Sequence, residues 1–324
     1  MDEEALTALA FGPDARSADP IPRDGSPRQR LLAAIVLGAR GRYAAAADLL
    51  DPLRRGSDPL TASLAASTLA SHRRQLGAHV LARKLDGEAL LAVGLRSATV
   101  QSGSMAASSQ PAASSLDAPS PDASRGRDLQ ANELLDPGGL VEPTEDPHGL
   151  DLQGARADAL LGLAADNLAL GRIAAARRLA VRAAQADRRW RATIRGGWVG
   201  AEIELADGQP EAAVAPARLA YETAVARYAR RHIVKSGIVL GVALLSAGQD
   251  GARELVVAAA ADAEKYELDS LSWVADRVAA DLDHDRAEEY RFRSRQVLHA
   301  VLRHADPGVM RIAHESPWVP VGPG

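Results

Sequence analysis

The chain has 324 residues and a mass of 34.0 kDa, a length that allows one elongated unit or two ordinary domains. Aromatic residues make up only 3% of it, too few to stack the bases of a single-stranded nucleic acid, and no cysteine is present for disulfides, thiol catalysis or cysteine-ligated zinc. The net charge of −4 argues against a protein that coats DNA, and a core of Ala, Leu and Val favours packed helices over sheets.

The first residues are acidic and are followed by Pro13, Pro20 and Pro22, so we expect a flexible segment over 1–27. This stretch lacks the basic start and the apolar run of a secretory signal. No window has the roughly 18 uninterrupted apolar residues that a membrane span needs. We therefore expect a cytoplasmic protein that does not enter a membrane.

Apolar residues recur at helical spacing through most of the chain, and glycines interrupt them at intervals. The clearest unit runs from Leu31 to Asp58 and has a glycine turn at Gly41 between two helices. Looser copies of this unit have their turns at Arg73, Gly171, Gly208, Gly248 and Asp283 to Asp285. Their spacing predicts pairs of antiparallel helices.

The composition changes abruptly to Ser, Ala, Pro and Gly between Gln101 and Asp128, a stretch that cannot bury enough apolar area to become ordered. About two helix pairs precede it, fewer than the three usually needed, so we expect them to dock on the array beginning near Leu150. The predicted regions are a flexible N-terminal segment (1–27), two helix pairs (28–95), a disordered linker (96–150), a helical array (151–306) and a C-terminal tail (307–324).

The first unit resembles the tetratricopeptide repeat (TPR), a helix–turn–helix unit. The residues that match the glycine, aromatic, alanine and apolar positions of that motif are Gly41, Tyr43, Ala46, Leu50 and Leu53, with Pro59 just past its end. The stretches Arg230–Leu244 and Leu271–Leu282 are also similar to the repeat arrays of large actinobacterial LuxR-type regulators, although the DNA-reading and nucleotide-binding modules of those regulators have no counterpart here. The resemblance implies an all-α, TPR-like solenoid of antiparallel helix pairs, interrupted by the linker, in a regulatory setting.

Motifs of catalysis are missing from the sequence. It contains no phosphate-binding loop, dinucleotide fingerprint, nucleophile elbow or H-E-x-x-H helix, and its eight histidines lack the i, i+4 spacing of a helical metal site. The acidic run from Asp281 to Glu289 lacks the glycine and the closing glutamate of a calcium loop, and acids at a helix start explain it. We expect no enzyme, no catalytic residue, no metal and no cofactor.

Charge is unevenly distributed along the chain. Between Arg172 and Arg195 there are eight arginines and one acid, whereas between Asp250 and Glu289 there are twelve acids and four bases. Helical spacing predicts that Arg178, Arg182 and Arg189 share one face. It also predicts a second stripe on a later helix, at positions i, i+4 and i+8, formed by Arg227, Arg231 and Lys235. The candidate partner-binding residues are Arg178, Arg182, Arg189, Trp190, Arg227, Arg231 and Lys235.

If both stripes line one wall of the superhelix, they form a groove that attracts an acidic partner. The sequence therefore predicts a non-enzymatic scaffold or regulatory adaptor that binds a protein or peptide segment, with nucleic acid a less expected ligand. The alternative is a small-ligand sensor or helical-repeat enzyme with a buried pocket. For that alternative the polar groups near apolar stretches are Asn167, Glu202, Glu204 and His232. The sequence does not determine the oligomeric state.

Overall fold

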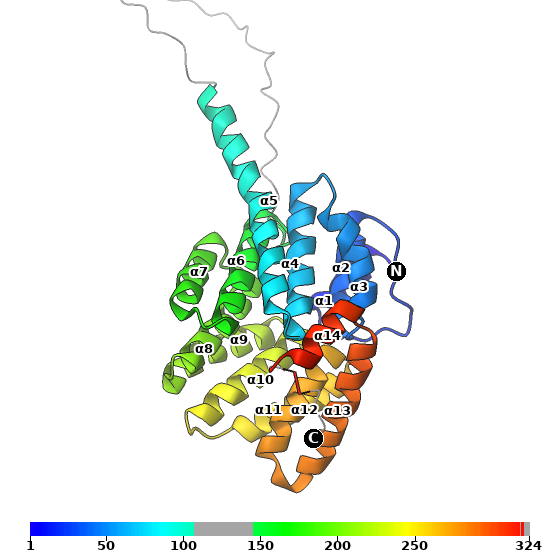
Figure 1. Cartoon of the computed structure of the whole chain (residues 1–324), viewed down its shortest axis with the longest axis vertical. Helices are drawn as coiled ribbons and strands as arrows, with labels where there is room; N and C mark the ends of the chain where they lie inside the picture. The colour runs from blue at the N-terminus through cyan, green and yellow to red at the C-terminus, as the bar shows by residue number, and fades with distance from the viewer. Residues whose placement is uncertain (107–144, 318, 321–324) are drawn as a thin grey trace, which may run out of the picture.

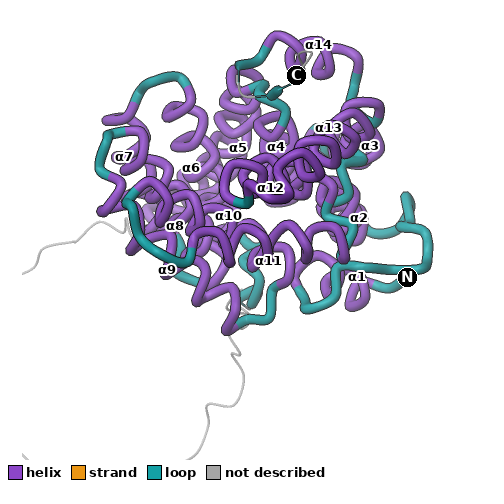
Figure 2. The backbone as a smooth tube through the Cα atoms, turned by 90° about the horizontal axis from the view of Figure 1, so that it is seen from below, coloured by secondary structure: helices purple, strands orange, loops and turns teal. Residues whose placement is uncertain are grey.

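The computed structural model describes residues 1–106, 145–317 and 319–320, with side chains omitted for 95–106, and all regular structure within these ranges is helical (Figures 1 and 2). The helices form consecutive antiparallel pairs: α2 (Pro27–Ala39) with α3 (Tyr43–Arg54), α4 (Pro59–Gln75) with α5 (His79–Ala106), α6 (Leu152–Ala169) with α7 (Ile173–Ala186), α8 (Trp190–Ala206) with α9 (Pro210–Ala226), α10 (Arg230–Ser246) with α11 (Ala252–Lys265), and α12 (Asp269–Leu282) with α13 (Ala287–Arg303). Three shorter helices complete the fold: α1 (Glu3–Phe11), η1 (His284–Arg286) and α14 (Pro307–Glu315). The predicted all-α array of helix pairs is confirmed.

Helix starts follow local capping chemistry. The Ser26 side chain accepts from the backbone of Gln29, whose own side chain accepts from the backbone of Ser26, and this capping box starts α2. Asp58 caps α4 immediately before Pro59, where a missing N–H costs nothing. Asp151 caps α6 in the same way through the backbone N–H of Gly154. Short polar residues and proline thus fix where these three helices begin.

Glycines form most of the turns inside the helix pairs. Gly41, Gly171, Gly208 and Gly248 have φ values from 64° to 73°, in the left-handed region that glycine adopts without strain, so the predicted turns at these positions are confirmed. The second pair differs from the prediction, because its turn lies at Gly77 (φ 77°) and not at Arg73. Arg73 remains in the last turn of α4, where a cation is favourable near the negative end of the helix dipole.

The pairs lie side by side in chain order, and the second helix of each packs on the first helix of the next. The first helices also contact one another in sequence from α2 to α12, so they form the inner side of a curved array. The two N-terminal pairs dock on the rest as predicted, because α4 and α5 both pack against α6.

The array curves until its sixth pair meets its first (Figure 1). The backbone N–H of Ala44, in α3, donates to the carbonyl oxygen of His304, just after α13, over 2.8 Å. Gly41 lies at this junction, and a Cβ there would stand 2.6 Å from Cγ2 of Val301, so the contact needs a glycine. The inner helices therefore surround an interior and do not form an open rod.

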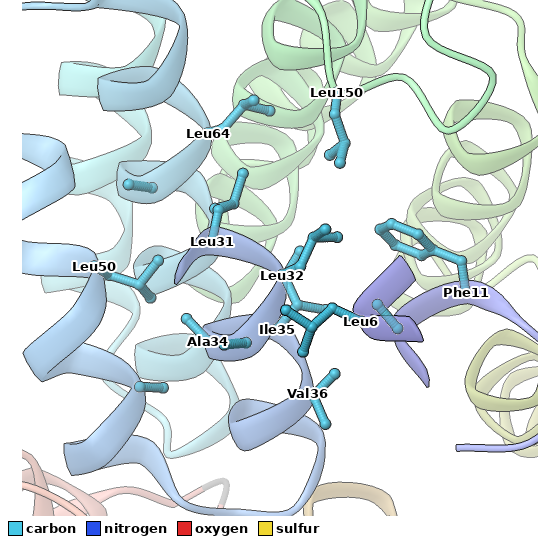
Figure 3. Close-up of a cluster of buried hydrophobic side chains, with 14 of the residues drawn as sticks. Leu6, Phe11, Leu31, Leu32, Ala34, Ile35, Val36, Leu50, Leu64 and Leu150 are labelled. Carbon is cyan, nitrogen blue, oxygen red and sulfur yellow. The ribbon is translucent and has the colours of Figure 1, made fainter. Parts of the chain in front are cut away.

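Helix α1 closes part of this interior. Leu6 and Phe11 are buried in the largest apolar cluster, together with Leu32 and Val36 of α2 and Leu50 of α3 (Figure 3). The expected flexible segment 1–27 is therefore wrong for residues 3–11, because their apolar side chains find a buried face between α2 and α10.

The chain ends and the linker also differ in part from the prediction. The expected C-terminal tail contains α14, whose Val309 and Ala313 are buried against the first and sixth pairs. Residues 96–106 of the predicted linker 96–150 belong to α5, and residues 149 and 150 are buried, with Leu150 in the largest apolar cluster. The remainder of that prediction falls mostly on 107–144, outside the described residues.

Candidate functional site

The start of α10 brings two of the candidate cations into the interior. Tyr228 adopts a left-handed backbone conformation (φ 52°), which ends α9 and lets a new helix begin at Arg230. Arg231 and Lys235 then lie one turn apart on the same side of α10, and both are half-buried. His232, between them, is 4% exposed.

Within the described residues, neither Arg231 nor Lys235 forms an ion pair with a carboxylate. The Lys235 ammonium lies 4.4 Å from the centroid of the Trp198 ring, a cation–π contact. Burial, reinforced by neighbouring cations, lowers the pKa of Arg231 to about 10 and the pKa of Lys235 to about 8. Both side chains therefore stay charged at neutral pH, although their surroundings disfavour the charge.

Two further arginines approach from α8 and share one carboxylate. Arg191 Nη2 donates to Oδ2 of Asp158 over 2.5 Å, and Arg195 Nη1 pairs with the other oxygen of the same carboxyl. Asp158, on α6, is 6% exposed. One buried negative charge thus faces two positive charges, and burial lowers the pKa of Arg195.

Arg74 at the end of α4 completes the group. Its Nε donates to Oδ1 of Asp166 over 2.8 Å and its Nη2 donates to Oδ2 of Asp86 over 2.5 Å. Burial raises the pKa of Asp86 to about 7, so at neutral pH this carboxyl carries only part of its charge. We name the five side chains the interior cationic cluster: Arg74, Arg191, Arg195, Arg231 and Lys235. Within the described residues, three carboxylates form ion pairs with this cluster, Asp86, Asp158 and Asp166, and Glu202 acts on Lys235 without an ion pair, so the five cations outnumber these acids.

Neutral polar groups border Arg231. The rings of Tyr43 and His72 lie 5.3 Å apart, and the Tyr43 hydroxyl donates to Oε1 of Gln75 over 2.9 Å. Burial and then the charge of Arg231 lower the pKa of His72 to about 3, while burial raises the pKa of Tyr43. Arg231 is the strongest charged influence on both rings, which places its guanidinium near them.

His232 lies among the cations themselves. Its ring stacks on Trp198 with centroids 5.7 Å apart, and burial and then four members of the cluster lower its pKa well below the ordinary value. Within the described residues, Nδ1 of His232 and Nδ1 of His72 are buried without a hydrogen-bond partner. An unpaired buried polar group costs about 1–3 kcal/mol, so each of these two atoms is destabilising until a hydrogen-bond partner satisfies it.

An aromatic group lies between α1 and α10, beside the cluster. Trp190 contacts Phe11 (centroids 6.1 Å) and His148 (5.9 Å), and its Nε1 donates to the carbonyl oxygen of Pro147 over 3.0 Å. The guanidinium of Arg191 lies over the Phe11 ring at 5.2 Å. Trp190 is therefore held by the fold beside the cluster and is not an exposed stacking surface.

The structure separates the predicted basic residues. Arg178 and Arg182 are exposed on α7, the second helix of its pair. Their predicted common face with Arg189 is wrong, because α7 ends at Ala186 and Arg189 precedes α8, where it pairs with Asp151 and Asp187. The predicted stripe beginning at Arg227 is also interrupted, because Arg227 is exposed at the end of α9 and only the two cations on α10 share a helix.

The polar residues predicted for a buried pocket have different surroundings. Asn167 donates to the carbonyl oxygen of Leu163 over 2.8 Å, and Glu204 pairs with Arg177 at the surface. Glu202 is half-buried and raises the pKa of Lys235, against the larger effect of burial. His232 is the member of this set that lies within the cluster.

Sequence reasoning missed most residues around these cations. Tyr43 and His72 come from the first two pairs, and Arg195 comes from a segment read only as part of a basic run. A signal was available in the spacing of Arg191 and Arg195, which lie four residues, about one turn, apart on a helix with many buried residues. Their meeting with Arg231 depends on the curvature of the whole array.

The described residues contain no group of three or more His, Asp or Glu side chains arranged to hold a metal ion. The acidic run near α13 instead pairs with arginines, for example Asp283 with Arg253 over 2.9 Å. None of the described helices combines the length and the apolar character needed to cross a membrane. Neither a model of a known protein family nor a curated protein matches the sequence, so the assignment of a function depends on the geometry of the cluster.

Proposed function

We propose that the protein is a non-enzymatic binding module, a scaffold or regulatory adaptor, that holds an acidic segment of a protein or peptide partner against the interior cationic cluster. The observation that carries the proposal is that Arg231 and Lys235, on an inner helix, lack a carboxylate partner within the described residues. A buried cation without a counter-charge is costly, and a carboxylate supplied by a partner removes that cost.

The chemistry of the cluster favours acidic ligands. A guanidinium can form two parallel hydrogen bonds with one carboxylate, and such charge-assisted bonds are stronger than neutral ones. The surrounding wall of apolar side chains concentrates the positive field in the interior and speeds the capture of a negatively charged segment.

The histidines of the site support binding over catalysis. The pKa of His72 is lowered to about 3 by burial and then by Arg231, and the pKa of His232 lies well below its usual range for the same kind of reason. A general base works best with a pKa near the working pH. These imidazoles stay neutral at pH 7 and accept a proton only weakly, which suits groups that donate hydrogen bonds to a ligand.

A peptide-binding measurement tests the proposal. A fluorescently labelled, glutamate-rich peptide is titrated with the protein, and a lysine-rich peptide serves as the negative probe. The double variant R231Q/K235Q should weaken binding about tenfold or more, which corresponds to about 1.4 kcal/mol. The matched control R178Q/R182Q removes two exposed charges from α7 and should retain binding. Equal loss in both variants would show nonspecific attraction by surface charge and would contradict the proposal.

A further inference from the structure

Arg231 and Lys235 are spaced to hold one small anionic group. Side chains four residues apart on a helix have Cβ atoms about 5–6 Å apart, so both cationic heads can reach the oxygens of a single carboxylate or phosphate. Trp198 limits the movement of the Lys235 ammonium from one side through the cation–π contact of 4.4 Å. The pair is therefore partly preorganised, which lowers the entropy cost of binding.

Two carboxylates of the interior, Asp158 and Asp166, are already engaged by other cations. Asp158 is shared by Arg191 and Arg195, and Asp166 accepts from Arg74 over 2.8 Å. Within the described residues, none of these acids pairs with the two cations of α10. Glu202 raises the pKa of Lys235 but, in the part of the chain that the structure describes, forms no ion pair with it, so a ligand oxyanion would meet two cations without displacing an existing ion pair.

Neutral hydrogen-bond groups lie near this pair, since His232 and Lys235 both contact the Trp198 ring and Arg231 acts on both His72 and His232. His232 is 4% exposed and is located between the two cations in the sequence of α10, and His72 is 1% exposed beside Tyr43. The Nδ1 atoms of both imidazoles are buried and have no hydrogen-bond partner within the described residues. A neutral imidazole can donate through one ring nitrogen, so each ring can supply one hydrogen bond to an oxyanion.

The approach of His72 to this region depends on one glycine. A Cβ on Gly38, in α2, would stand 2.0 Å from Nε2 of His72, so any larger residue there would push the imidazole away. The fold thus accommodates a buried polar ring at a place where an apolar side chain would pack more easily.

We propose that Arg231, Lys235, His72 and His232 form a site for one oxyanion group, a carboxylate or a phosphate. The group belongs either to a free small molecule or to an acidic side chain of a bound partner segment. The inference rests on the proposed function in that it identifies the group recognised at the same cations, but a free anion can bind whether or not a peptide does.

Thermal unfolding in the presence of defined anions tests the site. Inorganic phosphate and succinate are added at constant ionic strength, with chloride as the reference. We expect a saturable rise in Tm, about 3–5 °C at one hundred times Kd, with at least one of the two anions. The rise should be absent in R231Q and in K235Q, and it should persist in R178Q/R182Q.

Nuclear magnetic resonance locates the anion independently of stability. Titration of the same anion should shift the imidazole nitrogen signals of His72 and His232 in the full chain, and the K235R variant should preserve those shifts. A Tm rise that remains unchanged in R231Q, or that leaves both imidazoles unaffected, would overturn the site.

The peptide measurement separates the two proposals and the two sources of the oxyanion. If free anions bind and the glutamate-rich peptide does not, the oxyanion site is supported as a small-molecule site and the proposed function fails. If the peptide binds, requires both cations of α10 and shifts both imidazoles, the oxyanion is a partner carboxylate and both proposals are supported. If the peptide binds with neither imidazole shifted and no free anion binds, the oxyanion site fails and the proposed function stands.

Discussion

Arg74 of α4 donates from Nε to Oδ1 of Asp166 in α6 over 2.8 Å, and this contact joins residues 92 positions apart in the chain. The same guanidinium donates to Asp86 of α5, and His79 approaches Oδ1 of Asp166 at 3.1 Å. Asp166 is fully buried, so the second and third helix pairs are connected by a charge network out of water. Because each of these buried charges depends on its partners, separation of the two pairs would leave them uncompensated, which opposes their undocking.

Replacement of Asp166 should be strongly destabilising. Asp166→Asn leaves the buried Arg74 with one acidic partner, and breaking a buried pair typically costs about 3–5 kcal/mol. The free energy of unfolding from urea denaturation is the measurement. Asp207→Asn is the matched control, because Asp207 pairs with Arg177 at the surface and should cost about 0–1 kcal/mol. Similar losses in the two variants would show that the interior pair does not hold the halves together.

Two glycines in helices should respond oppositely to alanine. Gly38→Ala places a Cβ 2.0 Å from Nε2 of His72, and overpacking of this kind typically costs about 1–3 kcal/mol. Gly87→Ala on α5 meets nothing within 4 Å and should stabilise by about 0.5–1 kcal/mol, because alanine favours the helix.

The double variant Gly38→Ala/His72→Ala provides the check on this interpretation. If the clash with His72 is the cause, the loss from Gly38→Ala should be smaller in the His72→Ala background than in the natural one. Thermal or chemical denaturation of the four proteins measures this coupling, and strict additivity would contradict the contact.

The fold was predictable because its signals are local. Glycine at the turns and apolar residues at helical spacing specify each helix pair by itself, and Gly171 illustrates this with a left-handed φ of 73° at the predicted position. The second pair is the exception, because its turn lies at Gly77, with a φ of 77°, four residues after the predicted position at Arg73. The burial of α1 was missed because three prolines after it suggested a flexible segment, whereas its helix contributes Leu6 and Phe11 to the core.

The candidate site was predictable only in part because it is assembled by long-range contacts. Arg231 and Lys235 were identified from their spacing of four residues on one helix. Their neighbours Tyr43 and His72 lie more than 150 residues earlier in the chain, and the curvature that returns the array to its first pair brings them together. Spacing along the sequence also overstated the basic surface, since α7 and α9 end before their predicted stripes do.

Leu6 should contribute to stability despite its position near the N-terminus. Its side chain is fully buried, so Leu6→Ala should cost about 2–5 kcal/mol through lost burial and a residual cavity. Leu219 on α9 is 53% exposed, and Leu219→Ala should change stability by no more than about 0.5 kcal/mol. Denaturation with guanidinium chloride measures both, and a neutral Leu6→Ala would show that α1 does not support the fold.

His72 should make the protein less stable in acid. Burial lowers its pKa in the folded state to about 3, below the value near 6.5 of the unfolded chain, so the unfolded state binds a proton first as the pH falls. The stabilising contribution of the neutral ring is complete above pH 6.5 and decreases by up to about 1.4 kcal/mol per pH unit between pH 6.5 and pH 3.

Comparison with a variant is needed because Asp86 acts in the opposite direction. Burial raises its pKa to about 7, so its contribution is present below pH 3.8 and is lost as the pH rises toward 7. The unfolding free energy of the natural protein minus that of His72→Leu isolates the contribution of the imidazole. This difference should fall from pH 6.5 to pH 4, because only the natural protein loses stability through His72. A constant difference, or a His72 ring that titrates near pH 6 by nuclear magnetic resonance, would contradict the assignment.

Arg231 should lower the stability of the ligand-free protein while supporting binding. Its guanidinium is half-buried without a carboxylate partner among the described residues, and its charge is opposed by Arg195 and Arg191. Replacing a poorly compensated buried charge by an apolar side chain of similar length is often stabilising, so Arg231→Met should raise the unfolding free energy by about 1–2 kcal/mol without added anions. The same variant should lose the rise in Tm with phosphate or succinate.

The reverse pattern distinguishes a binding residue from a structural one. If Arg231 served only the fold, Arg231→Met would lower the unfolding free energy, and phosphate or succinate would raise the Tm of the variant as much as that of the natural protein. Arg191→Met is the informative comparison, because Arg191 is buried and donates to Asp158 and to the carbonyl oxygen of His148. Arg195 still pairs with Asp158 in this variant, so the loss of these hydrogen bonds should destabilise by about 1–3 kcal/mol. Denaturation curves of both variants with and without anion therefore distinguish Arg231, which lacks an ion pair within the described residues, from Arg191, which is paired with Asp158.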